Sequence, residues 1–319
     1  MHKKKIINTL WLCAFTLAFG YVYIKNKETT PVVSEIQQLE NHHYNEIVYQ
    51  DEDQLLVPVH IEMNEESDLN VKALSLFQQM KSTPTIVETL SPVVDDTIEL
   101  YEVSLSNETL YLDFNEALLY LDKEDSLKFI EAMTWTMCHA FDVDQIHFTC
   151  NGQEVTNLPD SFISLSKDYH RNLGLNNFET VNATLHKTTP LTVYGNKSID
   201  GQSFYVPITE RINVQDLSIQ EKVALLLSKT SISSLVKENS ALKSLEILEG
   251  TKLENGKLTV NLNDEALLDE MSLNPQVMDL LILSLRQIDG VESIQFEVNG
   301  EHIGEEEVSQ NIVYNVIKM

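Results

Sequence analysis

The alternation of apolar and polar residues near the C-terminus also occurs earlier in the chain. The segment IQFEVNGEHI at Ile294–Ile303 matches IHFTCNGQEV at Ile146–Val155, which lies 148 positions upstream. Period-two alternation that ends in Asn-Gly is typical of a strand running into a tight turn. The chain therefore contains the same strand and turn twice.

The offset of 148 positions holds over the whole stretch from Asn107 to Gly152. Within it, apolar residues recur at helical spacing on one face of a long predicted helix, and their partners keep the same spacing. These pairs are Ile130 and Met278, Met133 and Leu281, Met137 and Leu285, and Ala140 and Ile288. A repeat of this length predicts two copies of one folding unit.

The region before each of these stretches is also duplicated, with a small shift in register. A Val-Tyr pair, a polar turn and a Val-Pro strand occur at 47–61 and again at 192–209. Pro58 and Pro207 predict edge strands, because proline cannot donate to a ladder. A helix follows in each copy, with Asp68 as one N-cap and a capping box from Ser218 at the other.

A pair of strands and the long helix complete each copy before the final strand. The pairs are expected at Ile98–Ser104 and Leu110–Phe114 in the first copy, and at Glu246–Thr251 and Leu258–Leu262 in the second. Each copy then has the order hairpin–helix–strand–strand–helix–strand. This order predicts an α+β fold, two tandem units that each have a sheet on one side and two helices on the other.

The domain boundaries follow from these patterns. We expect a membrane anchor or signal at residues 1–25, a charged spacer at 26–46 and the first domain at 47–157. A polar, irregular linker at 158–190 leads to the second domain at 191–312.

The longest uncharged run lies at the N-terminus. Ile6–Ile24 is nineteen residues long and follows a run of lysines at 3–5. As a helix it spans ~28 Å, close to the hydrocarbon thickness of a bilayer. The lysines stay in the cytoplasm, which places the body outside it. We expect a single retained span at the cell membrane, with cleavage after Gly20 and lipidation of Cys13 as the alternatives.

Composition and charge exclude some partners. Hydrophobic residues make up 43% of the chain and charged residues 22%, which is typical of a globular protein. The net charge of -27 argues against nucleic acid as a partner, because phosphates repel such a surface. The same charge suits a basic protein partner.

Sequence motifs for catalysis or phosphate binding are absent. The chain contains no H-E-x-x-H, G-x-S-x-G, G-x-x-x-x-G-K-[ST] or G-x-G-x-x-G sequence. His42, His43 and Glu46 have metal-ligand residue types but lack a third histidine or a thiol, so we interpret them as a solvated spacer. We therefore predict no enzymatic activity, no cofactor, and no catalytic, cofactor-binding or metal-ligating residue.

Acidic runs, cysteines and Trp135 are interpreted as structural. Asp95-Asp96 and Glu305–Glu307 are typical of solvated faces. Cys150 ends a predicted strand as a small buried apolar residue, and whether it is bridged to Cys138 stays open. Trp135 lies on the long helix, where packing is the better interpretation.

The two copies resemble the GerMN domain of bacterial sporulation and germination proteins. The resemblance is carried by a strand followed by Asn115 or Asn263, the long helix, a Val-x-x-Ile-x-Phe strand and the Asn-Gly turn. It covers 47–155 and 192–303, most of the chain after the apolar run. Many members of the family carry a lipobox, whereas Cys13 lacks one, which leaves the mode of anchoring open.

The resemblance implies a non-enzymatic envelope component of endospore formers, with a domain similar to ring-building folds. It implies partners among other envelope and sporulation proteins, a homo-oligomer or ring, and a role in the channel apparatus between mother cell and forespore. The alternative is a module that binds peptidoglycan or assists wall hydrolases.

Overall fold

The computed structural model describes residues 43–84, 87–159, 163–165, 167–177, 188–212, 217–232, 244–267, 273–303, 308–309 and 312–317. The expected membrane segment Ile6–Ile24, the acidic run Glu305–Glu307 and His42 lie outside these residues. Within them, no helix combines the length and apolar character needed to cross a bilayer.

The first copy has the predicted order of elements. They are β1 (Tyr44–Gln50), β2 (Leu56–Glu62), α2 (Leu69–Met80), β3 (Leu100–Ser106), β4 (Thr109–Phe114), η1 (Glu116–Tyr120), α3 (Lys123–Phe141), β5 (Gln145–Cys150), β6 (Gln153–Glu154), β7 (Tyr169–His170) and η2 (Arg171–Leu173). β1 pairs antiparallel with β2, whereas β4 pairs parallel with β5.

The second copy repeats this order. Its elements are β8 (Thr189–Ile199), β9 (Gln202–Ile212), α4 (Ile219–Ile232), β10 (Lys252–Glu254), β11 (Lys257–Leu262), η3 (Asp264–Ala266), α6 (Pro275–Leu285), β12 (Ser293–Val298), β13 (Glu301–His302), β14 (Val308–Ser309) and β15 (Val316–Ile317). The parallel pair Thr109↔Gln145 reappears 148 positions later as Lys257↔Ser293, and the rest of this register is repeated too. The predicted duplication is confirmed.

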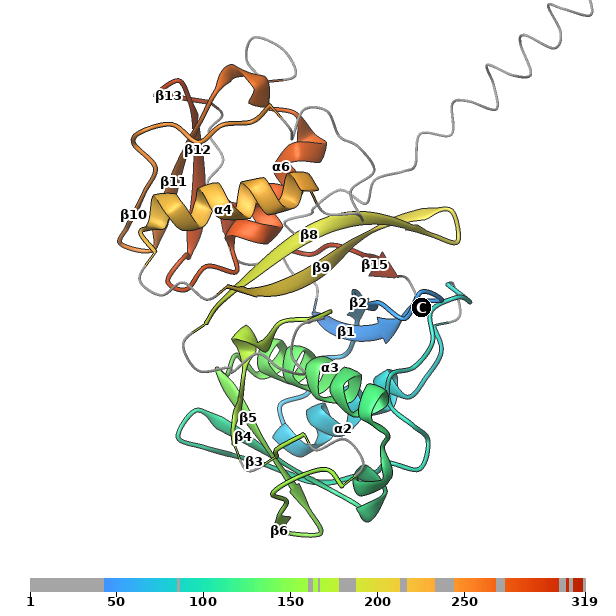
Figure 1. Ribbon diagram of the computed structural model, residues 1–319. Helices are drawn as coiled ribbons and strands as arrows, with labels where there is room; N and C mark the ends of the chain where they lie inside the picture. The colour runs from blue at the N-terminus through green and yellow to red at the C-terminus, as the bar shows by residue number, and fades with distance from the viewer. Residues whose placement is uncertain are drawn as a thin grey trace, which may run out of the picture.

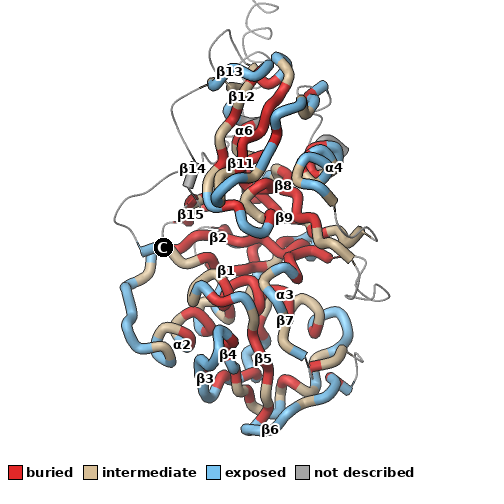
Figure 2. Tube along the Cα trace, turned by 90° about the vertical axis from the view of Figure 1, so that its left-hand side faces the viewer, coloured by how far each residue is buried: buried red, intermediate tan, exposed pale blue. Residues whose placement is uncertain are grey.

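Each pair of helices lies between a sheet and a hairpin (Figure 1). α2 and α3 contact β1 on one side and β3 or β5 on the other, and α4 lies between β8 and β10 in the second copy. The predicted α+β fold is confirmed, but the helices are covered on both faces and not on one. The hairpins β1–β2 and β8–β9 meet in the middle, where Figure 2 shows buried residues running from copy to copy.

The repeated Asn-Gly turn has the same support in both copies. Its asparagines have φ of 50° and 52°, a conformation that suits Asn and Gly in tight hairpin turns. Asp113 Oδ1 accepts a hydrogen bond from Gly152 N at 2.8 Å, and Asn261 Oδ1 accepts one from Gly300 N at 2.9 Å. The turn is therefore a requirement of the fold.

Both predicted helix starts are confirmed. Asp68 accepts a hydrogen bond from Val71 N at 2.9 Å. Ser218 N donates to the Glu221 carboxylate at 2.8 Å, and Ser218 Oγ accepts from Glu221 N at 3.3 Å. These contacts satisfy amides that the first turn of a helix leaves without partners.

One strand prediction was wrong. The strand expected at Glu246–Thr251 forms instead at Lys252–Glu254. Gly250 has φ of 103°, and Asn261 Nδ2 donates to Glu249 O at 2.6 Å. Ile247 pairs with Leu262 in an isolated bridge before these features, and the regular ladder resumes after them at Lys252.

The ends of the two copies also differ from the sequence-based picture. Within the stretch expected as a linker, β7 pairs with β5 in the first sheet. β15 crosses to the first copy and pairs parallel with β2, so β2 is a middle strand and not the edge strand expected from Pro58. Pro58 precedes His60 and Ile61 in the chain, which are the residues of β2 that pair with β15. Pro207 lies in β9, within a two-stranded sheet.

The cysteines and Trp135 lie in the core. Cys138 and Cys150 are buried free thiols, so the question of a bridge is answered in the negative. Burial raises the pKa of Cys138 to about 12, which makes it unreactive at neutral pH. Trp135 is 1% exposed, which confirms its packing role.

Candidate functional site between the two copies

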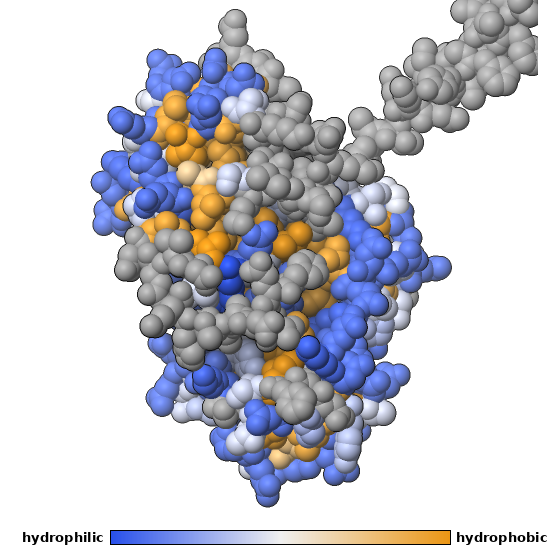
Figure 3. Space-filling model, in the orientation of Figure 1, coloured by the Kyte–Doolittle hydropathy of each residue, from blue (hydrophilic) through white to orange (hydrophobic). Residues whose placement is uncertain are grey.

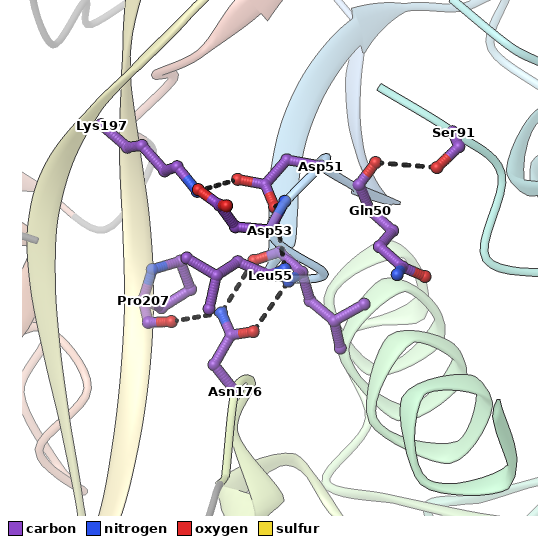
Figure 4. Close-up of polar contacts among 9 residues, drawn as sticks. Gln50, Asp51, Asp53, Leu55, Ser91, Asn176, Lys197 and Pro207 are labelled. Carbon is purple, nitrogen blue, oxygen red and sulfur yellow. Dashed lines mark hydrogen bonds and ion pairs between the residues drawn. The ribbon is translucent and has the colours of Figure 1, made fainter. Parts of the chain in front are cut away.

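The seam between the copies consists of the facing edges of β2 and β9 with two asparagine side chains between them. Asn176 Oδ1 accepts from Leu56 N at 2.7 Å, and its Nδ2 donates to Leu56 O at 2.8 Å and Pro207 O at 2.7 Å (Figure 4). One amide group therefore bonds to the backbones of both copies.

Asn315 makes the same three bonds from the other side. Its Oδ1 accepts from Tyr205 N at 2.8 Å, and its Nδ2 donates to Tyr205 O at 2.7 Å and Pro58 O at 2.8 Å. Tyr205 and Pro207 follow Leu56 and Pro58 by 149 positions, so the two asparagines occupy equivalent places. Both have positive φ, of 55° and 50°, which asparagine tolerates better than most residues.

The segments that carry these asparagines cross between the copies. His60 N in β2 donates to Asn315 O at 3.1 Å, and Thr209 N in β9 donates to Leu175 O at 2.9 Å. Each copy thus lends its C-terminal segment to a strand of the other. This arrangement, formed by the segments around Leu175 and Asn315, is here termed the tail exchange.

An ion pair adds to the seam. Lys197 Nζ in β8 lies 2.5 Å from Asp51 Oδ2 and 2.7 Å from Asp53 Oδ2, both in the β1–β2 turn (Figure 4). Burial acts to lower the pKa of Lys197, but its hydrogen bonds to the two aspartates outweigh burial and raise the pKa. The cation therefore stays charged where the copies meet.

A cavity of about 990 Å³ lies beside the seam. Residues of β1, β2 and α3 from the first copy line it, together with residues of β8, the segment 286–290 after α6 and the C-terminal segment. It is here termed the inter-copy cavity. Its chemically distinctive lining residues are Glu46, His60, Trp135, His139, Arg171 and Arg286.

Glu46 is a buried acid of this cavity, with 5% of its surface exposed. The Tyr314 hydroxyl donates a short hydrogen bond to its carboxylate. Burial alone would raise the pKa of Glu46. The positive charge that His139 and His60 carry when protonated at acidic pH, and the charge of Arg286, outweigh this effect. Together with the hydroxyl, they hold the pKa of Glu46 below its ordinary value, so the carboxylate is ionised at neutral pH.

The two histidines of the cavity are neutral at the same pH. Burial lowers the pKa of His60 and of His139, although Glu46 opposes the effect. Nδ1 of His60 lies 2.7 Å from Tyr314 O, and Nδ1 of His139 lies 2.7 Å from Trp135 O. A carbonyl only accepts, so Nδ1 carries the proton and Nε2 remains an acceptor.

Donors come from other walls of the cavity. The Arg286 guanidinium lies 5.7 Å from the centre of the Tyr314 ring and donates weakly to Ile312 O at 3.5 Å. Arg171 donates to Cys138 O at 3.0 Å, and its buried Nε has no hydrogen-bond partner among the described residues. The same is true of the Trp135 indole Nε1. The cavity therefore presents an ionised carboxylate, imidazole acceptors and guanidinium donors together.

Comparison with known proteins identifies the duplicated unit. A family model named Germane, described as "Sporulation and spore germination", matches residues 46–156 and 192–304. These ranges make up more than half of the chain. The chain belongs to the Germane family.

One relative of this Germane protein supports the assignment by its sequence, and its solved domains show the same fold. The chain is 27% identical over 203 residues to the spore germination protein GerM of Bacillus subtilis (strain 168), a match that covers 60% of this chain and 54% of GerM. The match thus spans about half the length of that relative. The solved tandem GerMN domains of GerM from Bacillus subtilis align with a TM-score of 0.71 and 22% identity, over 86% of this chain and 99% of theirs. The resemblance to GerMN domains and to the tandem protein GerM is confirmed.

The other residues considered as metal ligands or acidic sites form no common site, or they lie outside the described residues. His43 Nε2 lies 3.2 Å from Glu65, and these two largely exposed side chains line the inter-copy cavity together with the buried Glu46. Across the described ranges, no three histidine, cysteine or carboxylate side chains are placed to share a metal ion. Asp95 accepts from Thr97 N at 2.8 Å in an exposed turn.

The sequence reasoning missed the inter-copy cavity, yet a signal for it exists in the two copies. Aligning the Val-Tyr pairs places Glu46 opposite Leu191, and the offset of 148 places Arg286 opposite Cys138. Each charge therefore stands where the other copy has a buried, largely apolar side chain. Such differences between copies mark positions that the shared fold does not explain.

Proposed function

We propose that this Germane protein is a non-enzymatic, extracytoplasmic assembly component of an envelope-spanning complex between mother cell and forespore. Ile6–Ile24 would hold it to the membrane. The observation that carries the proposal is the tail exchange, which joins two copies of one unit into a single body that can contact neighbours through either copy. The family description, sporulation and spore germination, supports this setting.

The surface of the first copy supports a role in partner contact. Among the residues whose exposure is described, all large apolar side chains with high exposure lie in this copy. They are Val71, Leu74, Tyr101, Leu105, Tyr111 and Tyr120. Figure 3 also shows hydrophobic side chains on the face of the second copy, with hydrophilic side chains around the outline. The net charge of -27 favours a partner with a basic surface.

Deletion of the coding sequence tests the proposal. We expect a reduced yield of heat-resistant spores, and microscopy should show sporulating cells that stop before mature spores form. Crosslinking in sporulating cells should recover a complex of envelope proteins. A wild-type spore yield, together with a strictly monomeric crosslinking pattern, would contradict the proposal.

Membrane attachment needs a separate measurement. We expect the protein to fractionate with membranes and to be digested by protease added to protoplasts. A variant with two leucines of the apolar run replaced by lysine, Leu12→Lys and Leu17→Lys, should leave the membrane fraction, because charges at the centre of a span are costly. Retention of that variant would contradict the single-span anchor.

A further inference from the structure

We propose that the inter-copy cavity binds a short peptide with a free ammonium group and a free carboxylate group. The cavity volume of about 990 Å³ lies at the upper end of the range for ligand sites in proteins. It is larger than a single amino acid requires. This inference does not rest on the proposed function.

The ammonium group has a site at the acidic wall. Glu46 is ionised, and the hydroxyl of Tyr314 occupies only its Oε1 oxygen. Nδ1 of His60 and Nδ1 of His139 each donate a hydrogen bond to a backbone carbonyl, so the two Nε2 atoms remain as acceptors. Three acceptors around one cavity suit a group that carries several donors and a positive charge.

The carboxylate group has a site at the Arg286 guanidinium. Among the described residues, no carboxylate lies within ion-pair distance of Arg286, and its hydrogen bond to Ile312 O is long, at 3.5 Å. Guanidinium groups bind carboxylates through paired hydrogen bonds. The Arg286 guanidinium therefore has N–H groups that remain available to donate to a ligand carboxylate.

The two charged groups come from different copies, and neither has a charged counterpart in the other. Leu191 stands opposite Glu46, and Cys138 stands opposite Arg286. The pair therefore arose by divergence of two similar units at their common boundary. A binding site explains why both changes face the same cavity.

Calorimetry on the full chain in detergent micelles tests the proposal with trialanine as the probe. We expect binding that weakens at least tenfold when the peptide is N-acetylated and at least tenfold when it is C-amidated. Equal binding of free and blocked peptides, or no binding of trialanine to the folded wild-type protein, would overturn the proposal.

Variants assign each end of the peptide to its residue. In Arg286→Gln, we expect weak binding that no longer depends on amidation, and in Glu46→Gln, weak binding that no longer depends on acetylation. Lys252→Gln and Glu254→Gln, an exposed pair in β10, are the matched controls and should bind as the wild type does. If Glu46→Gln does not fold, the blocked peptides on the wild-type protein still decide the question. Because the assay uses purified protein, its outcome is separate from that of the sporulation experiments.

Discussion

Single buried side chains control how the stability of this protein depends on pH. Glu131 in α3 is 2% exposed, and Asn177 N donates to its carboxyl group at 3.3 Å. Burial raises the pKa of Glu131 to about 8, and the backbone hydrogen bonds only partly oppose this rise. The side chain is therefore mostly protonated at neutral pH, directly beside the tail exchange.

Replacement of Glu131 by glutamine should change the pH dependence of unfolding. Between pH 4.5 and about 8, the unfolded wild-type chain binds fewer protons at this residue than the folded chain. Wild-type stability therefore falls as pH rises through this window. Glu131→Gln should lose this dependence and gain stability relative to the wild type from pH 5 to 8. Denaturant titrations at each pH would measure the difference, with exposed Glu124→Gln as the control that keeps the wild-type slope.

His147 also favours the protonated form in the folded state, so its effect on stability has the same sign as that of Glu131. Burial would lower its pKa, but hydrogen bonds to Asp168 at 2.7 Å and Glu154 at 2.8 Å raise the pKa above 6.5. A raised pKa gives stability that is complete below pH 6.5 and is lost as pH rises through the folded-state value. His147→Gln should cost about 1 kcal/mol or less at pH 6, because both carboxylates are partly exposed, and nothing at pH 9. A constant loss at all pH values, or a similar effect of His302→Gln, would count against this assignment.

At the scale of elements, local patterns predict most of the fold and fail where contacts are long-range. The helices and paired strands were predictable because their apolar spacing, their caps and the Asn-Gly turns are all local signals. The tail exchange was not predictable from the sequence. β15 is only two residues long, and the sequence around Asn176 and Asn315 is typical of a loop. The inter-copy cavity was hidden for the same reason, since its walls meet only after both copies have folded.

The tail exchange predicts that a destabilising substitution in one copy also lowers the stability of the other copy. Asn315→Ala removes three hydrogen bonds to backbone groups of Tyr205 and Pro58, which should cost about 3 kcal/mol. The fluorescence of Trp135, in the first copy, should report the lowered denaturation midpoint although Asn315 belongs to the second. Asn172→Ala, at an exposed neighbouring position, is the control and should cost less than ~0.5 kcal/mol. An unchanged Trp135 transition would show that the copies unfold independently.

At the scale of the whole molecule, the two copies share a fold but not a surface. Exposed Tyr111 in the first copy stands opposite Thr259 in the second, and Leu105 is half exposed. Among the described residues, the first copy therefore carries the most exposed large apolar side chains, whereas the shared architecture alone would predict two similar faces.

This asymmetry gives a prediction for assembly. The double variant Tyr101→Ser and Leu105→Ser should lose most of its crosslinks to envelope partners in sporulating cells. Its thermal stability should stay near that of the wild type, because both side chains are about half exposed. Thr259→Ser in the second copy is the control. Unchanged crosslinking in the double variant would place the contact surface elsewhere.

The reciprocal hydrogen bonds of Asn176 and Asn315 also bear on the ancestry of the protein. A single-unit precursor could make the same bonds only by associating with an identical chain about a two-fold axis, each subunit lending its end to the other. Fusion of two such genes would preserve the geometry and release the residues around it from symmetry. Glu46 and Arg286 are residues that a symmetric homodimer would have had to place twice, and one chain needs each of them only once.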